Sequence, residues 1–375
     1  MIFKDKAKLS PRYIPERLPH REDEISKILS MLPEEPEQAN LVLQLQGPPG
    51  TGKTSSAVHV GRRISSPEVT YLYVNLKILG SKFAAYRELL RQFLGTSPSR
   101  SLSSEEMLVQ LIRGLKEKKK YAAIILDEID YFLKSSRDTS IVYDMTRINE
   151  IDPIEGSNVI CTMFIVRDPK WRRGLGGAER SSLGSLIVLF NPYTKEQLVD
   201  ILNYRAEEAF TKGAVDLEVV EYVAEQVVEE SEGDVRYALD ILLHAGTLAE
   251  NRGQEKVTLD DVREVISQLS PNINSEELQA LNKNEKIILL SLAYALKSSS
   301  QPYVGFSDLY EVYKEVARSY RISSSIKMLE KGVQDLHDRN IIRVSGISRI
   351  GLNAPVNKLI PIVERLIKTI KEGHK

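Results

Sequence analysis

The sequence predicts an α/β domain built on a parallel sheet, followed by a helical domain and a C-terminal winged helix. Short apolar runs alternate with helical patterns in the first half of the chain, which favours a parallel sheet because crossover helices return the chain to the same edge. Strand-like runs stop after Asn191-Pro192, and helical patterns follow. The C-terminal segment then shows helical patterns and two short strand-like pieces, an order typical of a winged helix.

Composition excludes several classes of protein. The chain has 375 residues, 42% hydrophobic and 27% charged, as in globular proteins long enough for more than one domain. No run approaches the ~20 apolar residues that span a bilayer, and the charged N-terminus lacks the apolar centre of a secretion signal. A single cysteine excludes an internal disulfide framework, and the five histidines lack the spacing of a Cys/His metal site. We therefore expect a cytoplasmic protein.

The sheet domain is predicted at residues 1–192. Its first strand leads directly into a glycine-rich loop, and a helical pattern follows the loop. The other strand signals are apolar runs rich in β-branched and aromatic residues. The predicted strands are 41–45, 70–75, 122–126, 159–166 and 186–189.

The glycine-rich loop satisfies the phosphate-loop pattern between a strand and a helix. Its glycines allow backbone N–H groups to close around phosphates, Lys53 brings a cation to the β and γ oxygens, and the Thr54 hydroxyl can ligate Mg²⁺. A glycine-rich turn that binds nothing would not require Gly-Lys-Thr at this spacing. The loop therefore predicts an ATP/ADP site with Mg²⁺. Its binding residues are Gly47, Pro48, Pro49, Gly50, Thr51, Gly52, Lys53, Thr54 and Ser55.

Two carboxylates end the third predicted strand. In Ile124-Ile-Leu-Asp-Glu-Ile-Asp130, Asp127 and Glu128 fall at the carboxyl end of the strand, where open α/β sheets bind ligands. Solvated loop acids are commoner than such sites, but the phosphate loop upstream favours a Walker B motif. Asp127 would then hold Mg²⁺, and Glu128 would orient and deprotonate the attacking water.

The helical domain is predicted at residues 193–270. A capping box at Thr194-Lys-Glu-Gln197 starts a helix that runs to residue 208. Further on, Arg236 falls in the first turn of a helix, from which its guanidinium could reach the γ-phosphate. A helical arginine is usually solvated or ion-paired, but a neighbouring ATPase core favours a catalytic sensor. The later helical patterns are 216–230, 234–250 and 258–268.

The C-terminal domain is predicted at residues 276–375, after a linker at 271–275. From residue 281 onward there are sixteen Lys/Arg and nine Asp/Glu, a balance of +7 against −8 for the rest of the chain. This basic segment is the candidate DNA surface, and a solvated basic face is the alternative. The predicted helices are 283–297, 306–319 and 323–339, and the strand-like pieces are 341–344 and 349–352.

These motifs resemble the initiator clade of AAA+ ATPases, specifically the archaeal replication initiators of the origin-recognition and cell-division-control type. The resemblance covers nearly the whole chain and implies an AAA+ core with a helical lid. It also implies an ATP/ADP-switched, nucleoid-associated protein that recognises double-stranded origin DNA, with initiator paralogues and the replicative helicase as partners. It rests on Tyr13-Ile-Pro-Glu-Arg-Leu-Pro-His-Arg21, the phosphate loop, Leu-Asp-Glu-Ile-Asp130, Ser181-Ser-Leu-Gly184, Gly233-Asp-Val-Arg-Tyr-Ala-Leu-Asp240 and the winged helix.

The resemblance implies further site residues. In such relatives the N-terminal element lies over the adenine, and a helical insertion that matches residues 83–100 touches DNA; an ordinary amphipathic helix is the alternative there. The implied nucleotide neighbours are Tyr13, Ile14, Pro15, His20, Arg21 and the lid residue Tyr204. The implied DNA contacts of the insertion are Lys82, Arg87, Arg91 and Arg100. Those of the winged helix are Ser323, Ser324, Ser325, Lys327 and Lys331, with Arg343 and Arg349 on the wing.

The chain departs from the family pattern at two positions. Relatives usually have an asparagine sensor after the fourth strand, where this chain has Arg167-Asp168. An Arg-Val pair that would mark a trans-acting arginine finger is also missing, and Arg180 is the nearest candidate. Both departures favour a slow ATPase that serves as a switch.

Two other functions fit the same motifs. A paralogous regulator would bind DNA to control transcription, and a protein-remodelling ATPase would use its winged helix to bind protein. A clamp loader is disfavoured because its Ser-Arg-Cys finger motif is absent. Footprinting on origins separates initiator from regulator, and charge reversal of Lys327 and Arg349 tests the remodelling function.

Overall fold

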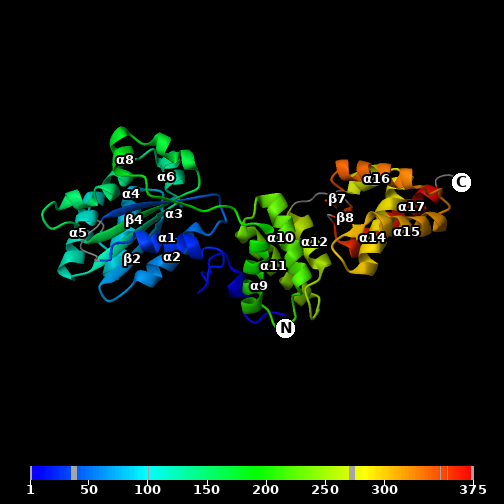
Figure 1. The fold of residues 1–375 in the computed structure, drawn as a ribbon, viewed down its shortest axis with the longest axis horizontal. Helices are drawn as coiled ribbons and strands as arrows, with labels where there is room; N and C mark the ends of the chain where they lie inside the picture. Colours follow the sequence, from blue (N-terminus) through cyan, green and yellow to red (C-terminus); the bar gives the residue numbers. More distant parts are fainter. Residues whose placement is uncertain are drawn as a thin grey trace. The chain divides into compact units, whose positions relative to one another are not determined.

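A computed structural model describes residues 2–34, 40–99, 101–269, 275–346, 348–352 and 354–372. It comprises two compact units (Figure 1). The first, called here the core unit, contains Ile14–Ile201 and Val228–Arg236. The second, called the C-terminal unit, contains the residues up to Tyr13, Leu202–Val227 and the chain from Tyr237 onward. The division falls inside lid helices, so the boundaries at residues 192 and 270 stay predictions.

The core unit is built on a five-stranded parallel sheet of order β2-β3-β4-β1-β5. All predicted strands are present, and Figure 1 labels β2 and β4 among the helices of this unit. The crossover helices and the parallel pairing confirm the predicted fold class. The strands are β1 (Leu41–Gln46), β2 (Val69–Asn75), β3 (Tyr121–Asp127), β4 (Val159–Val166) and β5 (Ile187–Leu189).

The centre of this sheet is buried on both faces, because alternate residues of β3 and β4 enter different hydrophobic clusters. On β3, Ala123 and Ile125 pack with α1 (Glu22–Met31) and α2 (Lys53–Ile64). Ile124 and its alternate neighbours pack with the helices of the other face. These helices include α4 (Lys82–Leu94), α5 (Ser104–Glu117), α6 (Ile129–Ser136) and α7 (Ser140–Thr146).

Shorter helices complete this second face. One is the 3₁₀ helix η4 (Pro169–Gly174), which contains Trp171, the single tryptophan of the chain. The Trp171 ring is 4% exposed and lies 6.1 Å from the ring centre of Phe164 on β4. The other short helices are α3 (Leu76–Leu79), the 3₁₀ helix η3 (Ile148–Ile151) and α8 (Gly177–Ser182).

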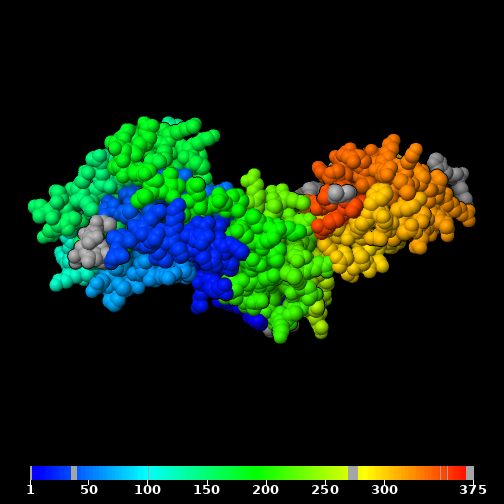
Figure 2. All heavy atoms as spheres, viewed as in Figure 1, coloured from blue at the N-terminus to red at the C-terminus, as the bar shows by residue number. Residues whose placement is uncertain are grey.

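The lid consists of four helices, and the N-terminal segment packs on them within the C-terminal unit. Phe3 stacks on Phe210 with ring centres 4.6 Å apart, and the Lys4 backbone N–H donates to Ala209 O at 2.8 Å. Figure 2 shows the dark blue atoms of the N-terminus against the green atoms of the lid. The lid helices are α9 (Lys195–Ala209), α10 (Leu217–Ser231), α11 (Val235–Asn251) and α12 (Leu259–Leu269).

The winged helix has a three-stranded antiparallel sheet of order β6-β8-β7 packed against helices. The predicted hairpin is present as β7 (Ile342–Ser345) and β8 (Arg349–Leu352). The sequence did not predict β6 (Val304–Gly305) or α17 (Val356–Glu372). The other helices are α13 (Ser275–Ala280), α14 (Lys283–Ser299), α15 (Phe306–Ser319) and α16 (Ile326–Asp338).

Two predicted boundaries need correction. The helix predicted from residue 323 begins at Ile326, because the Ser325 side chain caps it by accepting the Met328 N–H at 3.3 Å. Ser275, predicted as linker, is the first residue of α13, and the rest of that linker lies outside the described residues. Within the described part of the chain, no helix is both long and apolar enough to cross a membrane.

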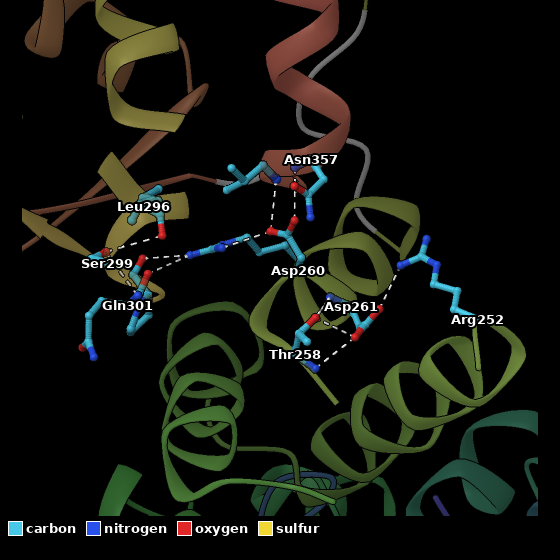
Figure 3. Close-up of polar contacts among 11 residues, drawn as sticks. Arg252, Thr258, Asp260, Asp261, Leu296, Ser299, Gln301 and Asn357 are labelled. Carbon is cyan, nitrogen blue, oxygen red and sulfur yellow. Dashed lines mark hydrogen bonds and ion pairs between the residues drawn. The ribbon is translucent and has the colours of Figure 1, made fainter. Parts of the chain in front are cut away.

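Polar contacts fasten the lid to the winged helix inside the C-terminal unit (Figure 3). The Asp260 carboxylate of α12 accepts the backbone N–H groups of Val356 and Asn357, each at 3.1 Å, at the start of α17. Arg263, which is 3% exposed, donates to Asp260 at 3.2 Å and to the carbonyl oxygen of Pro302 at 3.2 Å. Asp260 therefore caps a helix of another domain.

Candidate functional site

The phosphate loop connects β1 to α2 in the core unit, and two glycines let it turn. Gly50 has φ +70°, and a Cβ added to it would lie 1.9 Å from Asp234 Oδ1. Gly52, with φ +84°, is the N-cap of α2. Because only glycine adopts this backbone freely and fits this space, the loop can present its N–H groups at the start of a helix, where phosphates bind.

Lys53 lies buried beneath the loop. Its side-chain Nζ donates to Gly47 O at 2.7 Å and also to Pro48 O. Burial lowers the pKa of Lys53 to about 8; the Asp127 carboxylate opposes the shift, and the Arg167 and Arg236 guanidinium groups add to it. An anionic ligand would favour the charged form of this lysine.

Asp127 closes the site at the end of β3. Its Oδ2 accepts hydrogen bonds from Thr54 Oγ1 and from the Tyr73 hydroxyl, each at 2.9 Å. Burial raises the pKa of Asp127, and the bonds from Tyr73 and Thr54 oppose this shift. Sequence reasoning missed Tyr73. Its position near the carboxyl end of β2, the strand that pairs with β3, was the available signal.

Glu128 is the N-cap of α6 and has a left-handed backbone, with φ +59°. This conformation costs a non-glycine residue about 1–2 kcal/mol, so the surrounding structure must hold it. The Glu128 carboxylate forms an ion pair with the guanidinium of Arg167, the residue that follows β4. The departure from the expected sensor asparagine therefore lies in direct contact with Glu128, the predicted catalytic base.

A single pocket of the core unit brings together the four predicted catalytic residues Lys53, Asp127, Glu128 and Arg236. The Arg236 backbone N–H donates to Asp234 Oδ1 at 2.8 Å, which fixes the start of α11. Lysine and arginine cations thus face two carboxylates around the loop. The other lining residues are Pro49, Gly50, Thr51, Gly52, Thr54, Ile165 and Arg167.

Arg21 stabilises the backbone of the phosphate loop. It is 4% exposed, and its Nε donates to Thr51 O at 2.8 Å. The same guanidinium donates to Asn191 O at 2.7 Å and lies 3.8 Å from the ring centre of Tyr193. Arg21 therefore acts on the loop backbone, a role that sequence reasoning did not assign to it.

The other predicted nucleotide neighbours fall in both units. In the core unit, His20 Nε2 lies 2.9 Å from Asp200 Oδ2, Pro15 is buried, and Ile14 is partly buried. In the C-terminal unit, the hydroxyls of Tyr13 and Tyr204 both donate to Glu208 Oε1, at 3.4 and 3.5 Å. Their roles at a nucleotide stay predictions, as does that of Ser55, which is half-buried in the first turn of α2.

The donor set suits Mg²⁺. Thr54 and Asp127 supply hard oxygen atoms already held together at 2.9 Å. The described residues contain no group of three or more His, Cys, Asp or Glu side chains that could hold a metal ion. Mg²⁺ at nucleotide sites is usually held by one or two protein oxygens together with phosphates and water, so these residues fit it.

The predicted DNA residues of the core unit are mostly ion-paired. Lys82 bonds to Glu105 at 2.8 Å and to Asp144 at 3.2 Å. Arg91 on α4 donates to both carboxylate oxygens of Glu88, at 2.7 and 2.6 Å. Arg87 is partly buried on the same helix, and Arg100 lies outside the described residues.

The winged helix places its predicted DNA residues in two environments. Lys327 and Lys331 are exposed on α16, and Ser324 precedes that helix. On the wing, Arg343 donates to Gln226 of α10, and Arg349 lies 3.8 Å from Glu225 of the same helix. Because Figure 2 and these contacts agree, the wing rests on the lid within the C-terminal unit.

Three family models match successive parts of the chain. The AAA domain model matches residues 37–164, and the Cdc6 AAA+ ATPase-type lid domain matches residues 199–267. The C-terminal winged helix domain of CDC6 matches residues 276–356. The order of these matches is that of the predicted core, lid and winged helix.

Curated relatives match along nearly the whole chain. It is 30% identical over 382 residues to the ORC1-type DNA replication protein 1 of Sulfolobus acidocaldarius, covering 100% of this chain and 94% of the relative. It is 31% identical over 361 residues to the protein of the same name from Aeropyrum pernix, covering 93% and 89%.

Solved structures agree with these matches. Cdc6p from Pyrobaculum aerophilum aligns with TM-score 0.80 and 26% identity, covering 98% of this chain and 99% of that one. The ORC1 protein of Aeropyrum pernix, solved in complex with DNA, aligns with TM-score 0.63 and 29% identity, covering 97% and 99%.

Proposed function

The chain belongs to the family of ORC1-type DNA replication proteins, and from this membership we propose that it is a nucleotide-controlled initiator that binds duplex DNA at a replication origin. The observation that carries the proposal is the pocket in which Lys53, Asp127, Glu128 and Arg236 meet. A winged helix with exposed lysines follows in the same chain. This combination fits a switch that couples nucleotide to DNA.

The nucleotide is ATP or ADP with Mg²⁺. Lys53 and Arg236 would hold the β and γ phosphates, while Thr54 and Asp127 would supply oxygen ligands for the metal ion. Bound Mg²⁺ would neutralise phosphate charge. Glu128 accepts a proton from the water that attacks the γ-phosphorus, the bond to the β-phosphate oxygen breaks, and ADP and inorganic phosphate leave.

The DNA surface includes α16, whose Lys327 and Lys331 are exposed. Lysines on the second helix of a helix-turn-helix unit reach phosphates beside the major groove, which supports this assignment. The ORC1 protein of Aeropyrum pernix, 29% identical to this chain, was solved in complex with DNA. Arg343 and Arg349 serve as wing contacts, and Arg87 and Arg91 contribute from the core.

In this proposal, the bound nucleotide controls which partners the protein recruits. ATP and ADP stabilise different domain arrangements to the extent that their affinities for those arrangements differ. The arrangement selected by ATP engages origin DNA, other initiator paralogues and the replicative helicase. The family membership supports this step.

The test compares a duplex that contains an origin with a scrambled duplex in ATP and in ADP. Anisotropy of labelled DNA measures the affinity of the wild type and of Lys327→Glu/Lys331→Glu. We expect preference for the origin in ATP and a decrease of at least about tenfold in affinity in the double variant, as phosphate contacts are replaced by repulsion. The reversal Lys118→Glu/Lys119→Glu, at exposed lysines of the core unit, is the matched control. Equal affinity for both duplexes, unaffected by nucleotide, contradicts the proposal.

A further inference from the structure

The ion pair between Arg167 and Glu128 follows from the sheet topology. Strands β3 and β4 are parallel neighbours, so the residues just after their carboxyl ends lie side by side. Glu128 follows β3 and Arg167 follows β4, and their side chains meet. The Glu128 side chain is 10% exposed, so its carboxylate has little access to water.

The backbone beneath Arg167 is fixed as well. Asp130, which is 5% exposed, accepts the N–H groups of Arg167 and Asp168 at 3.1 and 3.0 Å through the same Oδ2. These bonds tie the end of β4 to the first turn of α6, which also carries Glu128 at its N-cap. Both residues of the ion pair are therefore tied to the first turn of α6.

The pair occupies one oxygen, Oε1, of the carboxylate that the proposed function needs. An oxygen of Glu128 that accepts from a guanidinium is not placed to accept a proton from water. Arg167 also lines the pocket beside Lys53 and Arg236, so the anion that can replace Glu128 as its partner is the terminal phosphate of a triphosphate. ADP lacks that phosphate.

We infer that Arg167 is a positioning residue that restrains Glu128, slows hydrolysis, and makes the site sensitive to the γ-phosphate. This inference rests on the proposed ATP-binding function. It concerns how the site is controlled through the residue that follows β4.

The first measurement is phosphate release by Arg167→Ala, Arg167→Met and Arg167→Lys in saturating ATP with Mg²⁺. Freed from the ion pair, Glu128 should raise kcat about fivefold or more in the alanine and methionine variants, while lysine keeps a cation and restores the slow rate. Arg173→Ala, at an exposed arginine on η4, is the matched control and should hydrolyse as the wild type does. Adding Glu128→Gln to Arg167→Ala should abolish the gain.

The second measurement does not depend on turnover. Affinities for fluorescent ADP and for a non-hydrolysable ATP analogue are compared in the wild type, Glu128→Gln, Arg167→Ala and the double variant. In Glu128→Gln, Arg167 is released and can turn toward the γ-phosphate. The substitution should therefore raise the ratio of the affinity for the ATP analogue to the affinity for ADP. This rise should be about threefold larger when Arg167 is present than when it is absent. Equal gains in both backgrounds would overturn the inference.

Different results would overturn the proposed function and the inference about Arg167. Normal nucleotide binding with unchanged or lower kcat in Arg167→Ala and Arg167→Met overturns the inference and leaves the proposed function standing. Absence of nucleotide binding in the folded wild type overturns both. Thermal melts of each variant by circular dichroism identify folding defects, and the methionine variant, which keeps the apolar stem of the arginine, guards against them.

Discussion

Gly50 shows how little room the phosphate loop leaves for a side chain. Its φ of +70° is almost the same as that of Gly80, at +69°, so an added Cβ meets the same backbone strain at both positions. The surroundings differ. At Gly50 the added atom would lie 1.9 Å from Asp234 Oδ1, whereas nothing lies within 4 Å of it at Gly80.

Gly50→Ala should therefore weaken nucleotide binding far more than Gly80→Ala does. We expect a decrease in affinity of about tenfold or more at Gly50, since the loop must move away from Asp234, and less than about twofold at Gly80. Both variants should lose about 1 kcal/mol of stability from strain. Titration with fluorescent ADP measures the difference, and equal decreases in the two variants would show that space at the loop is unimportant.

Cys161 carries a reactive thiol that solvent and reagents do not reach in the folded protein. It lies on the central strand β4, is completely buried, and its burial raises the pKa of the thiol to about 12. The thiolate is the nucleophilic form, so both exposure and ionisation oppose reaction.

Native protein at pH 8 should accordingly resist thiol reagents. We expect labelling of Cys161 to be roughly a hundredfold or more slower than in guanidinium, because reaction requires opening of the central sheet. The rate should rise with pH because the thiol that opening exposes ionises more readily than the buried one. Absorbance of the released aromatic thiolate follows the reaction, and rapid labelling without denaturant would contradict the buried placement of β4.

At the scale of elements, the contact between α12 and α17 caps a helix from nearly a hundred positions away along the chain. Asp260 satisfies two N–H groups at the start of α17 and also pairs with the buried Arg263. An unpaired buried guanidinium is costly, so one carboxylate serves two purposes. Burial tends to raise the pKa of the nearby Glu264, but bonds from Lys358 and Arg252 outweigh it and leave that pKa lowered, which adds a charged contact.

Asp260→Ala should destabilise the C-terminal unit by about 2–4 kcal/mol, because it removes the cap and leaves the arginine unpaired. Asp338→Ala, which removes an exposed carboxylate at the end of α16, should change stability by less than about 0.5 kcal/mol. Helical circular dichroism during urea denaturation measures both. Similar midpoints for the two variants would mean that the cap contributes little.

The sequence predicted most elements because their patterns are local. Strands such as β4 are continuous apolar runs, and the capping residues of α9 and α14 mark helix starts. It did not predict α17, in which Pro361 interrupts the expected helical pattern. The Asp260 cap was also unpredictable, since its partners lie nearly a hundred positions along the chain and no local pattern encodes them.

The candidate site divides in the same way. The phosphate loop and the acid pair were predictable because the chemistry fixes residue types at fixed spacing. Three contacts were not predictable, because they depend on which strands are neighbours in the folded sheet. They are the bond from Tyr73 to Asp127, the bond from Arg21 to the phosphate-loop backbone, and the ion pair of Arg167 with Glu128. Sequence reasoning identified Arg167 as a departure, and only the topology revealed its partner.

Over the whole molecule, charge is divided unevenly along the chain. From residue 281 onward the balance is +7, while the preceding part carries −8. The net charge of the whole chain is therefore near zero although its C-terminal domain is basic. The exposed cations of that domain include Lys327 and Lys331. Such asymmetry favours association with a polyanion through one domain.

DNA affinity should consequently fall steeply with salt. Removing Lys327 and Lys331 together by alanine substitution should lower the slope of log affinity against log salt by about two, one unit for each lysine that no longer neutralises a phosphate. Lys118→Ala/Lys119→Ala should leave the slope unchanged. Anisotropy titrations over a salt series supply the slopes, and an unchanged slope in the first variant would remove α16 from the DNA surface.

The single tryptophan gives the core unit an intrinsic fluorescent signal. Trp171 is buried beside Phe164, and the C-terminal unit contains no tryptophan. Selective excitation of tryptophan therefore follows unfolding of the core unit, whereas far-ultraviolet circular dichroism follows the helices of both units. Coincident transitions would indicate one cooperative system, and separate transitions would indicate independent folding. The unmodified chain can thus be followed unit by unit without an attached dye.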